Sequence, residues 1–185
     1  MISRRTALAA GVGALAALGG AGVALWQMRA GRAAAMAPWG LRFPSPAGPE
    51  LVLADLRGNP LLINFWATWC APCVIEMPLL DRFQKAQPAD GFQVVGLAVD
   101  HDAPVRQFLA SRPVSFRIGL AGPAGIELAR SFGNKDGGLP FTLAFDAAGR
   151  SIGQRLGLVR EADLDLWDRT RKDEDKAKKQ LSARG

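Results

Sequence analysis

Two cysteines close behind a near-continuous apolar segment constrain the fold of this chain more than any other feature. Residues 61–66 read LLINFW, and such a run is typical of a strand covered on both faces of a sheet. Cys70 and Cys73 follow, and Pro72 between them suits the first turn of a helix. We therefore expect a buried strand that leads directly into a helix over about 72–86, with both cysteines at its start.

The rest of the body alternates between strand-like and helix-like segments. Strands are predicted over 92–99, 115–120, 141–146 and 150–157, and helices over 104–112, over 125–132 and from Glu161 toward Arg171. The last two strands are separated by a short turn, which indicates an antiparallel hairpin. This order predicts an α/β fold with a central mixed sheet and helices on both faces.

The spacing of the two cysteines suits dithiol–disulfide exchange. A thiolate at a helix N-terminus is stabilised by unpaired N–H groups and the helix dipole, so the pKa of Cys70 should fall. Cys73 lies one turn further and could attack a mixed disulfide formed at Cys70. With only two cysteines, a disulfide-stapled scaffold and a four-cysteine zinc site are excluded. Half of a metal site, or a pair of inert core cysteines, are the alternatives for a bare pair of this kind.

Glu76 is predicted on the apolar face of the same helix. At about 100° per residue it lies on the side of Cys73, Met77 and Leu80, one turn below Cys73. Burial there should raise the pKa of Glu76 and let it exchange protons with the Cys73 thiol. The alternative is a glutamate that reaches solvent or forms an ordinary ion pair.

Pro140 immediately precedes a strand that should be central. Because proline cannot lie in the middle of a hydrogen-bonded ladder, it must begin that strand. A cis bond between Leu139 and Pro140 is compatible with this position. Such a turn, facing the cysteines, would offer backbone groups to an extended substrate.

Together these residues resemble the thioredoxin superfamily, and more narrowly its TlpA/ResA-like membrane-tethered thiol-disulfide oxidoreductases. The resemblance covers about residues 43–168 and is carried by NFWATWCAPC, by the following Glu-Met-Pro, and by GLPFTLAFDAAG. It implies a thioredoxin-like fold with Cys70 as nucleophile, Cys73 as resolving thiol, Glu76 as buried acid, Pro78 as helix kink and Pro140 as cis proline.

Two positions depart from related patterns. Asn64 stands where thioredoxin has a buried aspartate, and because asparagine does not titrate, the proton role shifts to Glu76. Leu139 replaces the small or β-branched residue common before the cis proline. The candidate catalytic residues are thus Cys70, Cys73 and Glu76; the candidate substrate-binding residues are Trp69, Pro72, Leu139 and Pro140.

The N-terminus is typical of an export segment. Arg4 and Arg5 precede residues 6–28, which contain no charged side chain, and such a run is long enough to span a bilayer. The string SRRTAL resembles a twin-arginine signal. We expect a signal peptide or signal-anchor over 1–35, a proline-rich extended linker over 36–50, the thioredoxin-like domain over 51–168 and a charged tail over 169–185.

The charge distribution argues against a nucleic-acid partner. The whole chain has a net charge of +6, but residues 36–168 carry 12 basic and 14 acidic side chains, so the excess lies at the two ends. A basic binding face needs positive charge clustered on the folded body.

The sequence therefore predicts an exported, membrane-tethered thiol-disulfide oxidoreductase that uses its own disulfide and no other cofactor. By resemblance it would reduce cysteine pairs of client proteins, in cytochrome c maturation or at copper-site thiols, and an upstream membrane thiol donor would re-reduce it. A disulfide-forming oxidant is one alternative. A copper chaperone that uses both cysteines and His101, the one histidine, is another, although a solvated loop histidine is the more common case.

Overall fold

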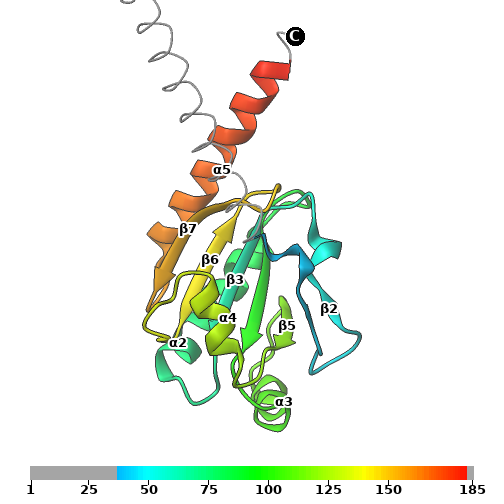
Figure 1. Cartoon of the computed structure of the whole chain (residues 1–185), viewed down its shortest axis with the longest axis vertical. Coiled ribbons are helices and arrows are strands. Elements are labelled where there is room, and N and C mark those ends of the chain that lie inside the picture. The colour runs from blue at the N-terminus through cyan, green and yellow to red at the C-terminus, as the bar shows by residue number, and fades with distance from the viewer. Residues whose placement is uncertain (1–36, 183–185) are drawn as a thin grey trace, which may run out of the picture. The chain divides into compact units, whose positions relative to one another are not determined.

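A five-stranded mixed sheet forms the centre of the computed structural model, which describes residues 37–182 (Figure 1). Its strand order is β5-β4-β3-β6-β7. The strands are β3 (Leu61–Trp66), β4 (Gln93–Ala98), β5 (Arg117–Leu120), β6 (Phe141–Phe145) and β7 (Ser151–Leu156). β3, β4 and β5 are parallel, whereas β6 runs antiparallel to both β3 and β7. The predicted mixed sheet and terminal hairpin are confirmed.

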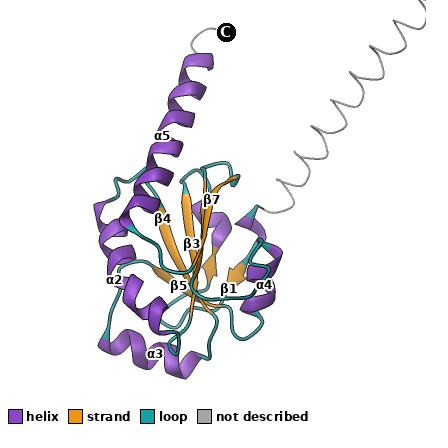
Figure 2. Ribbon diagram, turned by 90° about the vertical axis from the view of Figure 1, so that its left-hand side faces the viewer, coloured by secondary structure: helices purple, strands orange, loops and turns teal. Residues whose placement is uncertain are grey.

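Helices cover both faces of this sheet, as predicted (Figure 2). They are α2 (Ala71–Ala86), α3 (Asp102–Ser111), α4 (Gly125–Ser131) and α5 (Glu161–Ser182). Side chains of α2, α3 and α5 pack into one apolar cluster with Leu62 and Trp66 of β3. Ile63 and Phe65 point to the opposite face, toward α4, because successive strand residues alternate between faces.

The segment before the sheet differs from the extended spacer that its prolines predict. It contains a 3₁₀ helix, η1 (Pro38–Gly40), and β1 (Arg42–Phe43), which pairs antiparallel with β2 (Leu51–Val52). Trp39 and Phe43 are buried in the α4-side cluster. A second 3₁₀ helix, η2 (Leu53–Leu56), leads toward β3. Burial of two aromatic side chains ties this segment to the domain.

The last helix, predicted from Glu161 toward Arg171, continues into the charged tail as α5 and ends at Ser182. Leu164 and Trp167 bury its first half against the sheet. Among residues 37–182 no helix is both long and apolar enough to cross a membrane. The predicted export segment, residues 1–35, lies outside the described part of the chain.

Candidate active site

The two cysteines lie where β3 gives way to α2. Cys70 occupies the N-cap of α2, and the backbone N–H of Cys73 donates to its sulfur at 3.3 Å. The two residues form a disulfide, with 5.3 Å between their Cα atoms. Cys70 is 6% exposed and Cys73 is fully buried, so Cys70 is the more accessible sulfur, although it is more covered than a freely exposed nucleophile. The helix N-terminus is placed to stabilise a Cys70 thiolate in the reduced form.

Glu76 is buried one turn below Cys73, with only 2% of its surface exposed. Its Oε1 accepts a hydrogen bond from Asn64 Nδ2 at 2.7 Å, and its Oε2 accepts one from the Val159 backbone N–H at 2.8 Å. Burial raises the pKa of Glu76 to about 7, even though these two hydrogen bonds act in the opposite direction. The carboxyl can therefore change its protonation state near neutral pH, on the side of the helix that carries Cys73.

Asn64 connects this carboxyl to the sheet. Its Nδ2 also donates to the Thr142 hydroxyl at 2.9 Å, and Thr142 lies opposite Asn64 in the β3–β6 register. Thr142 is fully buried, as Asn64 is. The position that holds an aspartate in thioredoxin thus serves here as a donor to Glu76 and does not titrate.

The Leu139–Pro140 peptide bond is cis, as the resemblance implies. The Pro140 carbonyl accepts a hydrogen bond from the Gly157 N–H at 2.8 Å, so it is not free to pair with a substrate. None of the hydrogen bonds found among the described residues involves the Leu139 backbone. In this turn the Leu139 backbone, and not the Pro140 carbonyl, is therefore without a hydrogen-bond partner among the described residues.

Apolar side chains are exposed next to the redox loop. Trp69 is 68% exposed immediately before Cys70, and Ile75 on α2 is exposed to a similar extent. Pro72 between the cysteines is also exposed. Leu156 is partly exposed and lies against Gly138, just before the cis proline. An exposed apolar surface of this kind suits contact with another polypeptide.

Three contributors to this region were not predicted from the sequence. Val159 supplies a backbone donor to Glu76, and Thr142 is the second partner of Asn64. The buried carboxylate of Asp100 accepts hydrogen bonds from the loop that leads to Cys70. Asp100 lies two residues after the end of β4, and side chains at the carboxyl ends of parallel strands often belong to active sites, a signal that could have identified it.

His101 does not join the cysteines in a metal site. It occupies the N-cap of α3, and its side chain is exposed. Over residues 37–182, no three histidine, cysteine, aspartate or glutamate side chains are grouped so that they could hold a metal ion.

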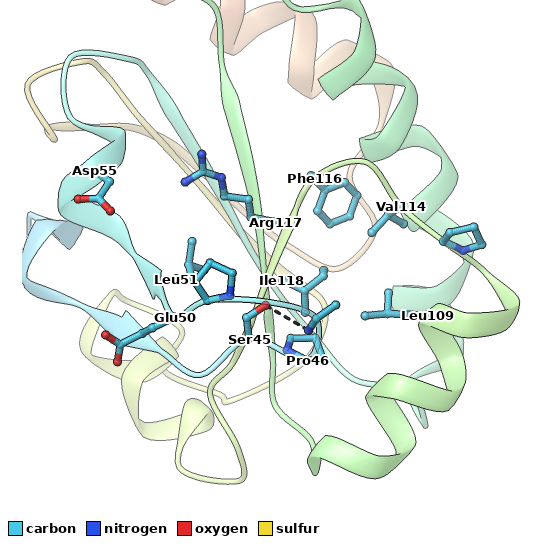
Figure 3. Close-up of a pocket in the computed structure, with 13 residues that line it drawn as sticks. Ser45, Pro46, Glu50, Leu51, Asp55, Leu109, Val114, Phe116, Arg117 and Ile118 are labelled. Carbon is cyan, nitrogen blue, oxygen red and sulfur yellow. Dashed lines mark hydrogen bonds between the residues drawn. The ribbon is translucent and has the colours of Figure 1, made fainter.

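A pocket of about 690 Å³ lies elsewhere, along the edge strand β5 (Figure 3). Its walls come from β5, the C-terminal end of α3 and the segment around Pro46. Neither cysteine, nor Glu76, nor the cis proline lines it. The redox site is consequently a surface around Cys70 and is separate from this pocket.

The fold and this site define a thioredoxin-like protein with a disulfide of the Cys-X-X-Cys type. A family model described as Redoxin matches residues 42–171, and the chain belongs to this family. The resemblance to TlpA/ResA-like proteins is also confirmed. The chain is 29% identical to the thiol-disulfide oxidoreductase ResA of Bacillus thuringiensis (strain Al Hakam) over 119 residues, which are 64% of this chain and 66% of that relative. It thus spans just under two thirds of the relative's length.

Solved structures show the same relationship. A putative thiol:disulfide interchange protein DsbE from Chlorobium tepidum is 31% identical, with a TM-score of 0.60, over 69% of this chain and 89% of that one. A thioredoxin-related protein from Neisseria meningitidis serogroup B is 32% identical, with a TM-score of 0.59, over 66% of this chain and 92% of the other.

Proposed function

We propose that this protein is an exported thiol-disulfide oxidoreductase that reduces cysteine pairs in extracytoplasmic client proteins. The observation that carries the proposal is the Cys70–Cys73 disulfide at the start of α2, with Glu76 buried one turn below. The names of the similar proteins, which are thiol-disulfide oxidoreductases and interchange proteins, support the reaction class. The reaction needs no cofactor, because the cysteine pair itself carries two electrons.

The residues at the site fit the two steps of disulfide exchange. In the reduced protein the Cys70 thiolate attacks a client disulfide, so a Cys70–client bond forms and one client sulfur leaves as a thiolate. Glu76 takes the proton of Cys73, whose sulfur then attacks Cys70. The Cys70–Cys73 disulfide forms, and the second client sulfur leaves and is protonated from solvent.

The composition of the redox loop favours a reductant. Strong disulfide oxidants have a stabilised reduced form, and a positive charge beside the thiolate is one way to achieve it. Here the two intervening residues are Ala71 and Pro72, and neither carries charge. The exposed Trp69 and the Leu139 backbone provide the surface on which a client segment would bind.

The remaining partners follow from the direction of electron flow. A reductant outside the cytoplasm must be re-reduced, so we assign an upstream membrane thiol donor to this chain. Residues 6–28 would hold it at the membrane, where apocytochrome c cysteines or copper-site thiols are suitable clients. The cysteines of either client would have to be reduced before they could bind haem or copper.

The reduction potential of the Cys70–Cys73 couple tests the direction. The full chain, in detergent, is equilibrated with glutathione and dithiothreitol buffers, and the reduced fraction is measured by the mass added on alkylation. A value at or below about −270 mV, the potential of thioredoxin, supports a reductant. A value near the roughly −120 mV of a strong periplasmic oxidant would overturn it. The protein reduced with excess dithiothreitol, in which both thiols are alkylated, gives the fully reduced reference.

A further inference from the structure

Asp100 holds the loop that leads to the reactive cysteine. Its Oδ2 accepts hydrogen bonds from the Thr68 backbone N–H at 3.0 Å and from the Thr68 hydroxyl at 2.5 Å. Its Oδ1 accepts from the His101 N–H at 2.7 Å. One carboxylate just after β4 thus binds both hydrogen-bond donors of Thr68, two residues before the reactive Cys70.

Two backbone hydrogen bonds fix the loop on either side of Thr68. The Val99 N–H donates to the Trp66 carbonyl at 2.7 Å, which joins the ends of β3 and β4 just before the loop. The Cys70 N–H donates to the Ala67 carbonyl at 3.2 Å and closes the turn. Thr68 is therefore held between two fixed points, and Asp100 determines where its polar groups point.

The carboxylate is ionised over the whole range in which a thiol titrates. Asp100 is only 7% exposed, and burial alone would favour its neutral form, but the hydrogen bonds from Thr68 and His101 prevail and hold the pKa of Asp100 below its ordinary value. Since two residues of chain span at most about 7 Å, its charge lies within about 10 Å of Cys70. The other ionisable groups at this end are His101, Asp102 paired with Arg106, and Glu76 below Cys73.

We propose that Asp100 is a positioning residue of the redox site, whose fixed negative charge disfavours the Cys70 thiolate and so favours the disulfide form of the couple. This inference deepens the proposed reductase and rests on it for its biological meaning. The α2 N-terminus stabilises the thiolate, and the negative charge of Asp100 opposes that effect. Removal of the charge should make Cys70 a better leaving group and the couple less reducing.

The test measures the thiolate directly and does not depend on the direction of electron flow. In the reduced full chain carrying Cys73→Ser, the rate of Cys70 alkylation by iodoacetamide is followed from pH 5 to pH 10. At about 10 Å and an effective dielectric constant of about 20 to 40, Asp100→Asn should lower the midpoint by about 0.6 to 1.2 pH units. Asp100→Glu keeps the charge and should stay close to the parent protein. Asp102→Asn, which removes a neighbouring exposed carboxylate, should change the midpoint less than Asp100→Asn.

Thr68→Val separates the charge from a loss of loop order. This substitution removes the hydrogen bond from the Thr68 hydroxyl to Asp100, and the carboxylate keeps its full charge. The midpoint of Cys70 alkylation should therefore stay unchanged or rise. A fall of the midpoint in both Asp100→Asn and Thr68→Val would show that loop loosening is the cause and would overturn the inference. An unchanged midpoint in Asp100→Asn would overturn it as well. If Asp100→Asn does not fold, a fall in Thr68→Val alone is sufficient to reject the charge effect. The reduction potential of the unmodified protein separately decides the proposed reductase.

Discussion

Glu76 should make the oxidised protein less stable as the pH rises through neutrality. Its pKa is about 7 in the folded protein, compared with an ordinary value of 4.5 that applies to the unfolded chain. The folded state therefore binds the proton more tightly, so the stabilisation is complete below pH 4.5 and is lost as the pH passes 7. At about 1.4 kcal/mol per pH unit the full loss is about 3 to 4 kcal/mol, and most of it falls between pH 5 and pH 8.

Urea unfolding of the oxidised chain measures this loss, because no thiol titrates while the disulfide is closed. Glu76→Gln should abolish most of the decline in the free energy of unfolding between pH 5 and pH 8. Its absolute stability should be lower at pH 5, since the Gln amide nitrogen faces a donor, either Asn64 or Val159. The slope with pH is therefore the decisive quantity. Other clearly shifted carboxylates, Asp81, Asp100 and Asp168, have lowered pKa values and act in the acid range.

Glu50→Gln is the matched control, because Glu50 is exposed and lies far along the chain from the cysteines. It should keep the slope of the unmodified protein. Equal slopes for Glu76→Gln and the unmodified protein would refute the buried, proton-binding carboxyl. In rapid-mixing assays with a client disulfide, Glu76→Gln should also slow closure of Cys73 onto the mixed disulfide while leaving the first attack by Cys70 unchanged.

Two further substitutions test the fold and the client surface. Trp39→Ala should reduce the free energy of unfolding in urea by about 3–5 kcal/mol, because removal of the buried indole leaves a cavity. A loss below about 1 kcal/mol would instead support the prediction that residues 37–50 are an extended spacer. Trp69→Ala should change stability by less than about 0.5 kcal/mol, since the side chain is mostly exposed, but should slow exchange with a protein disulfide. An equal slowing with dithiothreitol would place the effect at the sulfur and not at the client surface.

The strands and helices of the domain were predictable because their signals are local. The near-continuous apolar run LLINFW predicted β3 at its observed bounds, and proline at the second position of α2 marked the start of that helix to within one residue. The burial of Glu76 followed from the same kind of information, since helical periodicity places it beside Cys73 and Met77. The local sequence pattern was sufficient to predict a strand, a helix or the buried face of a helix, because each of these depends on residues within one element.

The remainder depends on contacts between distant segments. Four prolines predict an extended spacer over 37–50. In the structure, however, the Trp39 indole packs against Gly149, which is more than a hundred residues away in the sequence. The contact is so close that a Cβ added to Gly149 would lie 2.3 Å from Trp39 Nε1. The partner of Glu76 at Val159 is a backbone N–H, which every residue except proline carries, so no side-chain pattern identifies it. Asp100 is one of two aspartates in the string VDHDAP, and only the placement of β3 beside β4 distinguishes it.

The choice of asparagine at position 64 explains why Glu76 titrates near neutral pH. An aspartate there would place a second carboxylate within hydrogen-bonding distance of Glu76, and the mutual repulsion would push one of the two pKa values far upward. Asn64 instead offers two N–H groups, one to the carboxylate and one to Thr142. Its donation favours the charged form of Glu76 and limits the rise caused by burial, so the pKa lies at about 7. A carboxyl poised there can accept the Cys73 proton during one exchange step and return it to solvent afterwards, which a more strongly perturbed group would do slowly.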